Sequence, residues 1–503
     1  MKLTTEQLLL LSSLALLLGL TSFKKSHLNW LFKLKFRKSH SSKEADIFLV
    51  GEFISDDDRV RQTHIVGATG SGKTILLESL LFKDLARGNG ALVIDAKGDR
   101  EFYERVKKFC GSIGRSKDLH YLSASFPKES VVWNPCGLGN ASELQSKFFN
   151  SSIYSEPHYA KACELGLLLA FNDLTASSSN RLSLIELVQK LKEIKDLEKS
   201  KELEGLFLDL YNLTLSEWAK VLGCRSQSES KKEFKKELSI LELTRKNDIL
   251  FVDLPTENKA VQSARVGRLL LQELLLISGL RKLYPHIKSD KHFSVFIDEF
   301  DAFATPSFAT FLNKGRSSGF MIHMCHQTLS DLKKISSSFM GQVLGNCNVR
   351  FIFRQDDPDD AETWARFFGT KKIVKQTYQT ENHTQTGKAS NREAQEFRIS
   401  PDLIKELKTG QCVFSVKTKA TLKIIEIPFE KTIKILTQPS QRELGFEHIE
   451  ELVTPDEVAG KKLSSVNKGF APKNLNKLES DFEFLLIEKN KKGGNENEDE
   501  KNV

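Results

Sequence analysis

Cysteine is scarce in this chain of 503 residues, and its few cysteines form no pattern. The seven cysteines, an odd number, include no Cys-x-x-Cys pair, so a disulfide scaffold and a zinc ribbon are both excluded, and reduced thiols in a cytosolic compartment fit better. A large excess of one charge is also missing, because 74 basic and 66 acidic residues leave only +8. This balance excludes a histone-like basic protein and indicates no more than a mild preference for anionic partners. We find no internal repeats.

Long hydrophobic runs are absent except for one near the N-terminus, over residues 8–23. A helix of that length reaches about 24 Å across a hydrocarbon core of about 30 Å, so the span is marginal. Seven basic residues follow the run and only Lys2 precedes it, which places the rest of the chain in the cytoplasm. We interpret residues 1–23 as a transmembrane anchor and 24–46 as a basic juxtamembrane segment. A cleaved signal peptide and a peripheral or buried helix remain alternatives.

A phosphate-binding loop is the clearest motif. Residues 64–74 have the sequence HIVGATGSGKT, in which a short apolar strand leads into the P-loop pattern GxxxxGK followed by Ser or Thr. Glycines let successive backbone N–H groups turn inward around phosphate oxygens, and the following helix adds its positive N-terminal end. We expect Lys73 to meet the β- and γ-phosphates of ATP and Thr74 to offer its hydroxyl to Mg²⁺. The predicted phosphate-binding residues are Gly67, Ala68, Thr69, Gly70, Ser71, Gly72, Lys73 and Thr74.

Two further strands end in acidic residues. The strand over 292–297 ends in Asp298 and Glu299, as in a Walker B motif. We expect Asp298 to hold the Mg²⁺ and Glu299 to polarise the water that attacks the γ-phosphorus. The strand over 91–95 ends in Asp95 and leads into Lys97 and Asp99. We treat these three residues as adjacent to the site only, because a polar turn after a strand is also an ordinary structural feature.

The apolar strand over 320–326 ends at Gln327, a neutral donor and acceptor placed where it can sense the γ-phosphate. His323 and His326 on the same strand are better explained as packing and turn residues than as metal ligands, since no third ligand follows at zinc spacing.

An arginine on the loop over 314–319 is a candidate arginine finger. We expect Arg316 to reach into the site of a neighbouring subunit, with Arg350 and Arg354 as alternatives for this role and a solvated loop charge as the simplest explanation.

The order of these strands predicts an α/β fold with an open, mostly parallel sheet. We assign residues 47–136 and 244–436 to a RecA-like P-loop NTPase motor domain. Residues 137–243 contain no convincing strand, and apolar residues recur at helical spacing over 184–197, so we predict an all-α insert there. The polar tail over 437–503 is expected to be partly disordered.

Taken together, these motifs resemble a known family. The apolar N-terminus with GATGSGKT, VIDAKGD, FIDEF, GRSSGF and CHQ is similar to the type IV coupling proteins of bacterial conjugation and secretion, the TraD/TraG group related to FtsK- and HerA-type translocases, over about residues 45–435. The resemblance implies a hexameric ATPase at the bacterial inner membrane with its motor in the cytoplasm. By the same resemblance, Lys73, Thr74, Asp298, Glu299, Gln327 and Arg316 match the family's motifs, and ATP and Mg²⁺ are the expected cofactors.

The resemblance also implies partners: DNA bound without sequence preference, relaxase or relaxosome proteins or effector proteins, inner-membrane components of the secretion channel, and five further copies of the chain. Many members of the family carry two membrane spans, whereas one short apolar run is visible in this sequence. Two other functions remain open. One is a receptor for secreted effector proteins that uses ATP as an assembly switch, and the other is a HerA- or FtsK-like DNA-processing translocase.

Overall fold

The computed structural model describes residues 47–49, 52–154, 156–177, 182–198, 201–224, 237–257, 260–381 and 384–427. The predicted membrane anchor (1–23), the basic segment (24–46) and the tail (437–503) lie outside the described residues. Among the helices of the described part, none has both the length and the apolar character that a membrane crossing requires.

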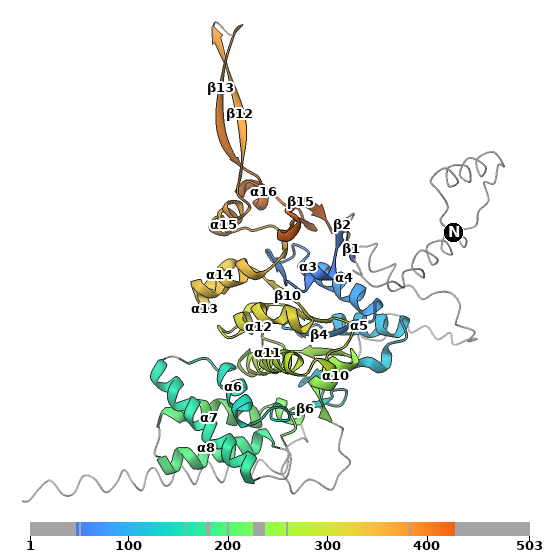
Figure 1. Cartoon of the computed structure of the whole chain (residues 1–503), viewed down its shortest axis with the longest axis vertical. Coiled ribbons are helices and arrows are strands. Elements are labelled where there is room, and N and C mark those ends of the chain that lie inside the picture. The colour runs from blue at the N-terminus through green and yellow to red at the C-terminus, as the bar shows by residue number, and fades with distance from the viewer. Residues whose placement is uncertain are drawn as a thin grey trace, which may run out of the picture. The chain divides into compact units, whose positions relative to one another are not determined.

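Within the described residues, nine strands form one sheet, in the order β15-β14-β11-β3-β10-β9-β4-β8-β5 (Figure 1). The strands from β11 to β5 pair in parallel, whereas β14 is antiparallel to both β11 and β15. The predicted α/β fold with a mostly parallel sheet is therefore confirmed. The strands span Thr63–Val66 (β3), Gly90–Asp95 (β4), Leu119–Ser123 (β5), Ile249–Asp253 (β8), Phe293–Ile297 (β9), Phe320–His326 (β10), Val349–Ile352 (β11), Gln411–Val416 (β14) and Thr421–Glu426 (β15).

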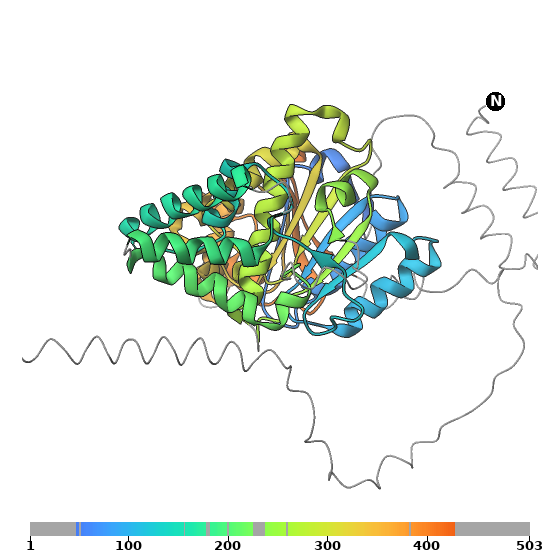
Figure 2. The same ribbon diagram turned by 90° about the horizontal axis from the view of Figure 1, so that it is seen from below.

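The two faces of this sheet pack against different groups of helices. On β4, Val93 belongs to the apolar cluster under α4 and α5, whereas Leu92 and Ile94 belong to the cluster shared with α11 and α12. This division follows from the strand geometry, because successive side chains point to opposite faces of a sheet. Figure 2 shows the strands between the blue helices and the green helices. The helices packed on the sheet include α4 (Lys73–Ala86), α5 (Arg100–Ser112), α10 (Ile240–Lys246), α11 (Ala260–Leu283), α12 (Phe308–Lys314), α13 (Leu329–Ile335), α14 (Ser337–Asn346) and α15 (Pro358–Phe368).

The segment predicted as an insert is mainly helical in its described residues. Its helices are α6 (Ala141–Asn150), α7 (Pro157–Ser177), α8 (Leu184–Glu198) and α9 (Glu204–Leu215). Along α8 one apolar stripe is buried, formed by Leu184, Leu187, Val188, Leu191 and Ile194, whereas Leu197 is 83% exposed. One short strand, β7 (Glu237–Leu238), also falls in this segment and pairs with β6 (Val132–Trp133). A buried ion pair between Lys147 on α6 and Glu273 on α11, 3.1 Å long, joins the insert to the helices on the sheet.

A long hairpin that the motif analysis missed follows α15. Strands β12 (Thr370–Glu381) and β13 (Thr384–Phe397) pair in antiparallel fashion, drawn in orange in Figure 1. Its sequence is rich in Lys, Gln, Thr and Glu and lacks an alternating apolar face, which is the signal by which a half-buried strand is recognised.

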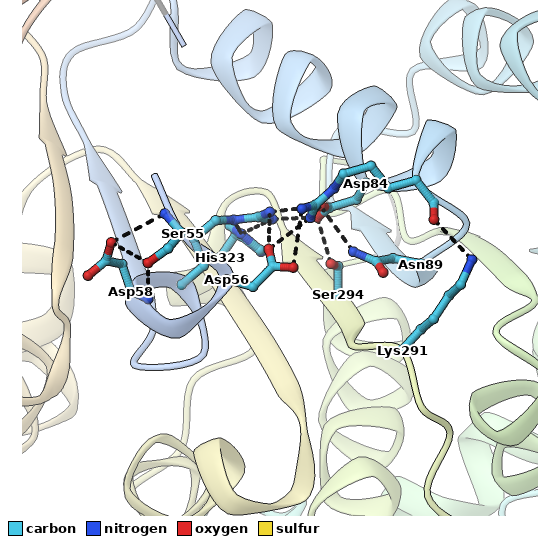
Figure 3. A network of polar contacts seen from close by, with 10 residues as sticks. Ser55, Asp56, Asp58, Asp84, Asn89, Lys291, Ser294 and His323 are labelled. Carbon is cyan, nitrogen blue, oxygen red and sulfur yellow. Dashed lines mark hydrogen bonds and ion pairs between the residues drawn. The ribbon is translucent and has the colours of Figure 1, made fainter. Parts of the chain in front are cut away.

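A buried cluster of charges fixes α4 to the sheet. The Asp84 carboxylate on α4 accepts hydrogen bonds from Arg59 (2.7 Å to Nη1) and Arg87 (2.7 Å), and also from the Ser294 hydroxyl on β9 (2.7 Å). Arg59 also contacts His323 on β10, 2.9 Å from its Nε2 (Figure 3). Burial alone would raise the pKa of Asp84, but the two arginines outweigh burial and lower it. The helix that carries the P-loop lysine is thus bonded to the strand that carries the acidic pair.

Replacing Asp84 by alanine is expected to destabilise the protein by about 3 kcal/mol, because it leaves buried guanidinium charge with less compensation. The measurement is urea unfolding of the purified chain followed by circular dichroism. Asp118→Ala is the matched control, since Asp118 pairs with Arg115 at the surface and its loss should cost under about 1 kcal/mol. Equal effects of the two substitutions would contradict the importance assigned to the buried cluster.

Candidate nucleotide site

The predicted P-loop joins β3 to α4. Gly70 and Gly72 have φ values of 73° and 112°, in the region that L-residues with side chains rarely adopt. At Gly67 an added Cβ would lie 2.5 Å from the Cβ of Phe353, so no side chain fits there without a shift of the backbone. The glycines of the motif are therefore required by the shape of the loop.

Lys73 is the first residue of α4 and is buried. Its Nζ donates hydrogen bonds to the backbone oxygens of Gly67 (2.6 Å) and Ala68 (3.1 Å). The ammonium thus lies in the concave side of its own loop, where phosphate oxygens can replace the two carbonyl oxygens as stronger, charged acceptors.

The predicted acidic pair follows β9, two strands away from β3. Asp298 is buried, and its N–H donates to the backbone oxygen of Ile94 at the end of β4 (3.0 Å). Glu299 has a φ of 45°, a left-handed conformation that is strained for a residue with a side chain. Such strain is characteristic of functional sites, and Glu299 lines the same cavity as the P-loop.

Lys97, which the motif analysis treated as merely adjacent, connects the P-loop to the acidic pair. Its Nζ lies 2.8 Å from Asp298 Oδ2, 3.2 Å from Thr74 Oγ1 and 3.6 Å from Glu299 Oε1. Burial alone would lower the pKa of Lys97, but the attraction of Asp298 and Glu299 outweighs burial and raises it. The ammonium is therefore charged at neutral pH.

Gln327 also connects the two motifs. Its side-chain amide donates to both carboxylate oxygens of Glu299, at 3.2 Å each, and its own oxygen accepts a hydrogen bond from the Thr69 hydroxyl (3.0 Å). The chain of contacts from Thr69 through Gln327 to Glu299 fixes the orientation of the Glu299 carboxylate relative to the P-loop.

The P-loop, Lys97 and Glu299 line a cavity of about 340 Å³, which is within the size range of small-ligand sites. One wall comes from the end of the sheet formed by β14 and β15, which carry no recognisable nucleotide-binding motif. Gly410 donates its N–H to the backbone oxygen of Ser71 (2.8 Å), and Ile427 donates to the backbone oxygen of Gly410 (2.8 Å). The lining residues are Thr69, Gly70, Gly72, Lys73, Thr74, Ile75, Lys97, Glu299, Thr409, Gly410, Glu426 and Ile427.

The turn that carries Lys97 is organised by Asp95 at the end of β4. One oxygen of its buried carboxylate accepts from the Lys97 N–H (3.1 Å) and the other from the Asp99 N–H (2.7 Å). Burial raises the pKa of Asp95 to about 6, and the nearby carboxylates of Asp298 and Asp253 act in the same direction.

The three arginines considered for the finger role lie in different surroundings. Arg316 is exposed in the turn before β10, so the whole length of β10 separates it from the cavity. Arg350 is buried and stacks on Phe367, with its guanidinium carbon 4.7 Å from the ring centre. Arg354 donates to Asp356 (2.8 Å), and its backbone oxygen accepts from the P-loop N–H of Ala68. Of the three, only Arg316 is both exposed and remote from the cavity of its own subunit.

The two histidines of β10 are buried and packed. His323 stacks on Phe296 with ring centres 4.3 Å apart, and His326 stacks on His64 at 4.8 Å. Within the described residues, no cluster of His, Cys, Asp and Glu is arranged to hold a metal ion.

The sheet and its glycine-rich loop define the class of the molecule, an α/β protein with a P-loop. The chain also matches, over residues 53–428, the family model described as the type IV secretion-system coupling protein DNA-binding domain. This match covers well over half of the sequence, so the chain belongs to the family of type IV secretion-system coupling proteins. The predicted resemblance to coupling proteins is thereby confirmed.

Individual relatives agree with this assignment. The type 4 coupling protein DotL of Legionella pneumophila is 35% identical over 80 residues, which are 16% of this chain and 10% of DotL, so the chain spans only a small part of this relative. The unbound bacterial conjugative coupling protein TrwBΔN70 superposes with a TM-score of 0.58 at 17% identity, covering 80% of this chain and 91% of TrwBΔN70. The plasmid coupling protein TrwB in complex with ADP and Mg²⁺ gives 0.58 at 16% identity, covering 81% and 93%. At these identities the likeness to TrwB shows a shared fold.

The raised pKa of Asp95 predicts a pH dependence. A carboxyl that releases its proton near pH 6 when folded and near 3.8 when unfolded makes the folded state less stable as pH rises from about 4 to about 6. Asp95→Asn removes this titration. The free energy of unfolding of wild type minus that of Asp95→Asn should therefore fall by about 2 to 3 kcal/mol over this interval and stay constant above it, as measured by urea unfolding at each pH. A constant difference across the interval would contradict the assignment.

Proposed function

We propose that this chain is a membrane-anchored ATPase that works as a hexamer in a conjugation or type IV secretion system, recruits DNA with its relaxosome proteins, and moves the DNA toward the secretion channel. One observation carries the enzymatic part: the P-loop, Lys97 and Glu299 line one cavity, Lys97 contacts the buried Asp298 beside it, and Gln327 connects Glu299 to Thr69 of the loop. Membership of the coupling-protein family supports the biological setting.

The hydrolysis step assigns a role to each polar group. The backbone of residues 67–74 and the Lys73 ammonium would bind the phosphates of ATP and stabilise charge that develops on them. Glu299, oriented by Gln327, would accept a proton from the water that attacks the γ-phosphorus. Gln327 also lies close enough to Thr69 to report on phosphate binding in the loop.

The residues present fit Mg²⁺ as the cofactor. The Thr74 hydroxyl and the Asp298 carboxylate are hard oxygen ligands of the type that Mg²⁺ prefers, and both already contact one cation, the Lys97 ammonium. When bound, Mg²⁺ would neutralise charge on the phosphates.

DNA is the favoured substrate. A motor that accepts any sequence should bind the phosphate backbone, so its binding should weaken with salt and tolerate any base order. We further propose that residues 1–23 anchor the chain in the bacterial inner membrane, with the motor in the cytoplasm and the channel's inner-membrane components as neighbours. The alternative in which the chain captures effector proteins is decided by the activity test below, whereas the apolar segment over residues 8–23 disfavours the alternative of a HerA- or FtsK-like DNA-processing translocase.

Lys73→Ala and Glu299→Gln should each lower ATP turnover by at least about 100-fold, the first through loss of phosphate contacts and the second through loss of the general base. The measurement is steady-state phosphate release from the purified chain, with and without DNA at low and moderate salt. Lys108→Ala, on the exposed face of α5, is the control and should keep wild-type turnover. ATP turnover that DNA stimulates in wild type but not in Glu299→Gln supports an ATPase that moves DNA.

Two results would change the proposal. ATP turnover that is unaffected by DNA but is stimulated by a partner protein favours a receptor for effector proteins. Wild-type ATP turnover in Lys73→Ala would contradict the assignment of residues 67–74 as the nucleotide site.

Arg316 provides a test of assembly. If Arg316 completes the site of a neighbouring subunit, Arg316→Ala and Lys73→Ala should both be inactive alone, whereas mixed rings should regain turnover where an intact site lies next to an intact arginine. The measurement is phosphate release after subunit mixing, with Arg354→Ala in place of Arg316→Ala as the comparison. Absence of recovery would contradict a finger supplied by a neighbour.

A further inference from the structure

The side chain of Lys97 occupies the meeting point of the oxygens assigned to the metal. Its ammonium lies 3.2 Å from Thr74 Oγ1 and 2.8 Å from Asp298 Oδ2, which are hydrogen-bonding distances, and it also lies 3.6 Å from Glu299 Oε1. A cation that contacts both Thr74 and Asp298 therefore uses the same lone pairs that a divalent cation would use.

The backbone under Lys97 is fixed, but its side chain has room to move. Both oxygens of the Asp95 carboxylate hold the turn. Gly98 in the turn has a φ of 69°, and a Cβ added there would lie only 3.0 Å from the Cβ of Pro255. The Lys97 side chain is nevertheless 42% exposed, because it extends along the wall of the open cavity. A four-carbon side chain on a rigid turn can move its ammonium by several ångströms without any change in the fold.

We propose that Lys97 is a built-in counter-ion of the metal site, and that its ammonium and a divalent cation are alternative occupants of the oxygens of Thr74 and Asp298. This inference rests on the proposed function, since it deepens the role of the same site. A metal that binds without a nucleotide must displace the Lys97 ammonium from Asp298, and this displacement disfavours binding of the metal. A metal that arrives with a nucleotide brings phosphate oxygens to which the displaced ammonium can move.

The arrangement makes metal affinity depend on the nucleotide. The Lys97 ammonium and the Asp298 carboxylate lie 2.8 Å apart and attract each other, so displacement of Lys97 disfavours binding of the metal alone. That cost is recovered when a phosphate accepts the ammonium, and it returns when the phosphate leaves. Lys97 therefore favours joint binding of metal and nucleotide and helps to expel the metal after hydrolysis.

The test measures Mn²⁺ binding to the purified full-length chain without nucleotide, by the loss of the free Mn²⁺ signal in electron paramagnetic resonance. In wild type, binding at this site should be weak. Lys97→Met should bind one Mn²⁺ per chain at least about tenfold more tightly, because the acidic oxygens lose their resident cation. Lys97→Arg, which keeps the charge, should resemble wild type.

Two further variants identify the site of binding. Adding Asp298→Asn to Lys97→Met should abolish the tighter binding, because the carboxylate is one of the two shared ligands. Lys108→Met, which removes one positive charge from the exposed face of α5, should bind as wild type does and so controls for the change in net charge. If Lys97→Met fails to fold by circular dichroism, Lys97→Gln takes its place with the same expectation.

Equal Mn²⁺ affinity in wild type and Lys97→Met would overturn the inference, as would tighter binding that survives Asp298→Asn. The readout contains no nucleotide, so it is independent of turnover. Unchanged Mn²⁺ binding together with normal ATP hydrolysis would reject the counter-ion and leave the ATPase intact. Tighter Mn²⁺ binding in Lys97→Met, together with a wild-type chain that hydrolyses no ATP, would support the counter-ion role of Lys97 and reject the ATPase.

Discussion

The parallel pairing of β3, β10, β9 and β4 is the constraint on which the site depends. Because these strands point the same way and pair in register, their carboxyl ends meet at one edge of the sheet. Segments more than 200 residues apart in sequence are thereby brought together: the P-loop and Glu299 line a common cavity, and Asp298 contacts Lys97 in its wall. The buried Asp84 cluster reinforces this arrangement, since it bonds α4 to β9 through Ser294. Without that register, each motif would be an isolated turn.

Concentrating acidic groups at one edge has an energetic consequence. Burial raises the pKa of Asp95, and the neighbouring carboxylates of Asp298 and Asp253 act in the same direction. Lys97 supplies the compensating charge, and Gln327 supplies hydrogen bonds to Glu299 without adding charge. The site is thus stable with a cation of its own, while the oxygens that bind this cation are also those suited to a metal. In the proposed counter-ion role, one lysine links the stability of the site to its affinity for a metal.

Sequence alone predicted the parts of this arrangement that have local signals. The P-loop has an unusual glycine pattern, and β9 and β10 are mainly apolar runs, so their positions were predicted within a residue. Residues whose role depends on distant partners gave no such signal. Lys97 sits in an ordinary polar turn, Gly410 and Ile427 reach the cavity only because β14 and β15 add to the far end of the sheet, and the hairpin of β12 and β13 lacks apolar alternation. The positions of these three features are set by pairing and packing in the folded chain and not by a local sequence pattern.

A structure of the chain with Mg²⁺ and a non-hydrolysable ATP analogue is the most direct test of the central claim. The account predicts that the triphosphate lies in the loop of residues 67–74, that its γ-phosphate faces Glu299, and that the metal touches Thr74 and is close to Asp298. A triphosphate bound elsewhere, or a γ-phosphate with Asp298 and Glu299 turned away from it, would contradict the interpretation of this edge of the sheet as a hydrolytic site.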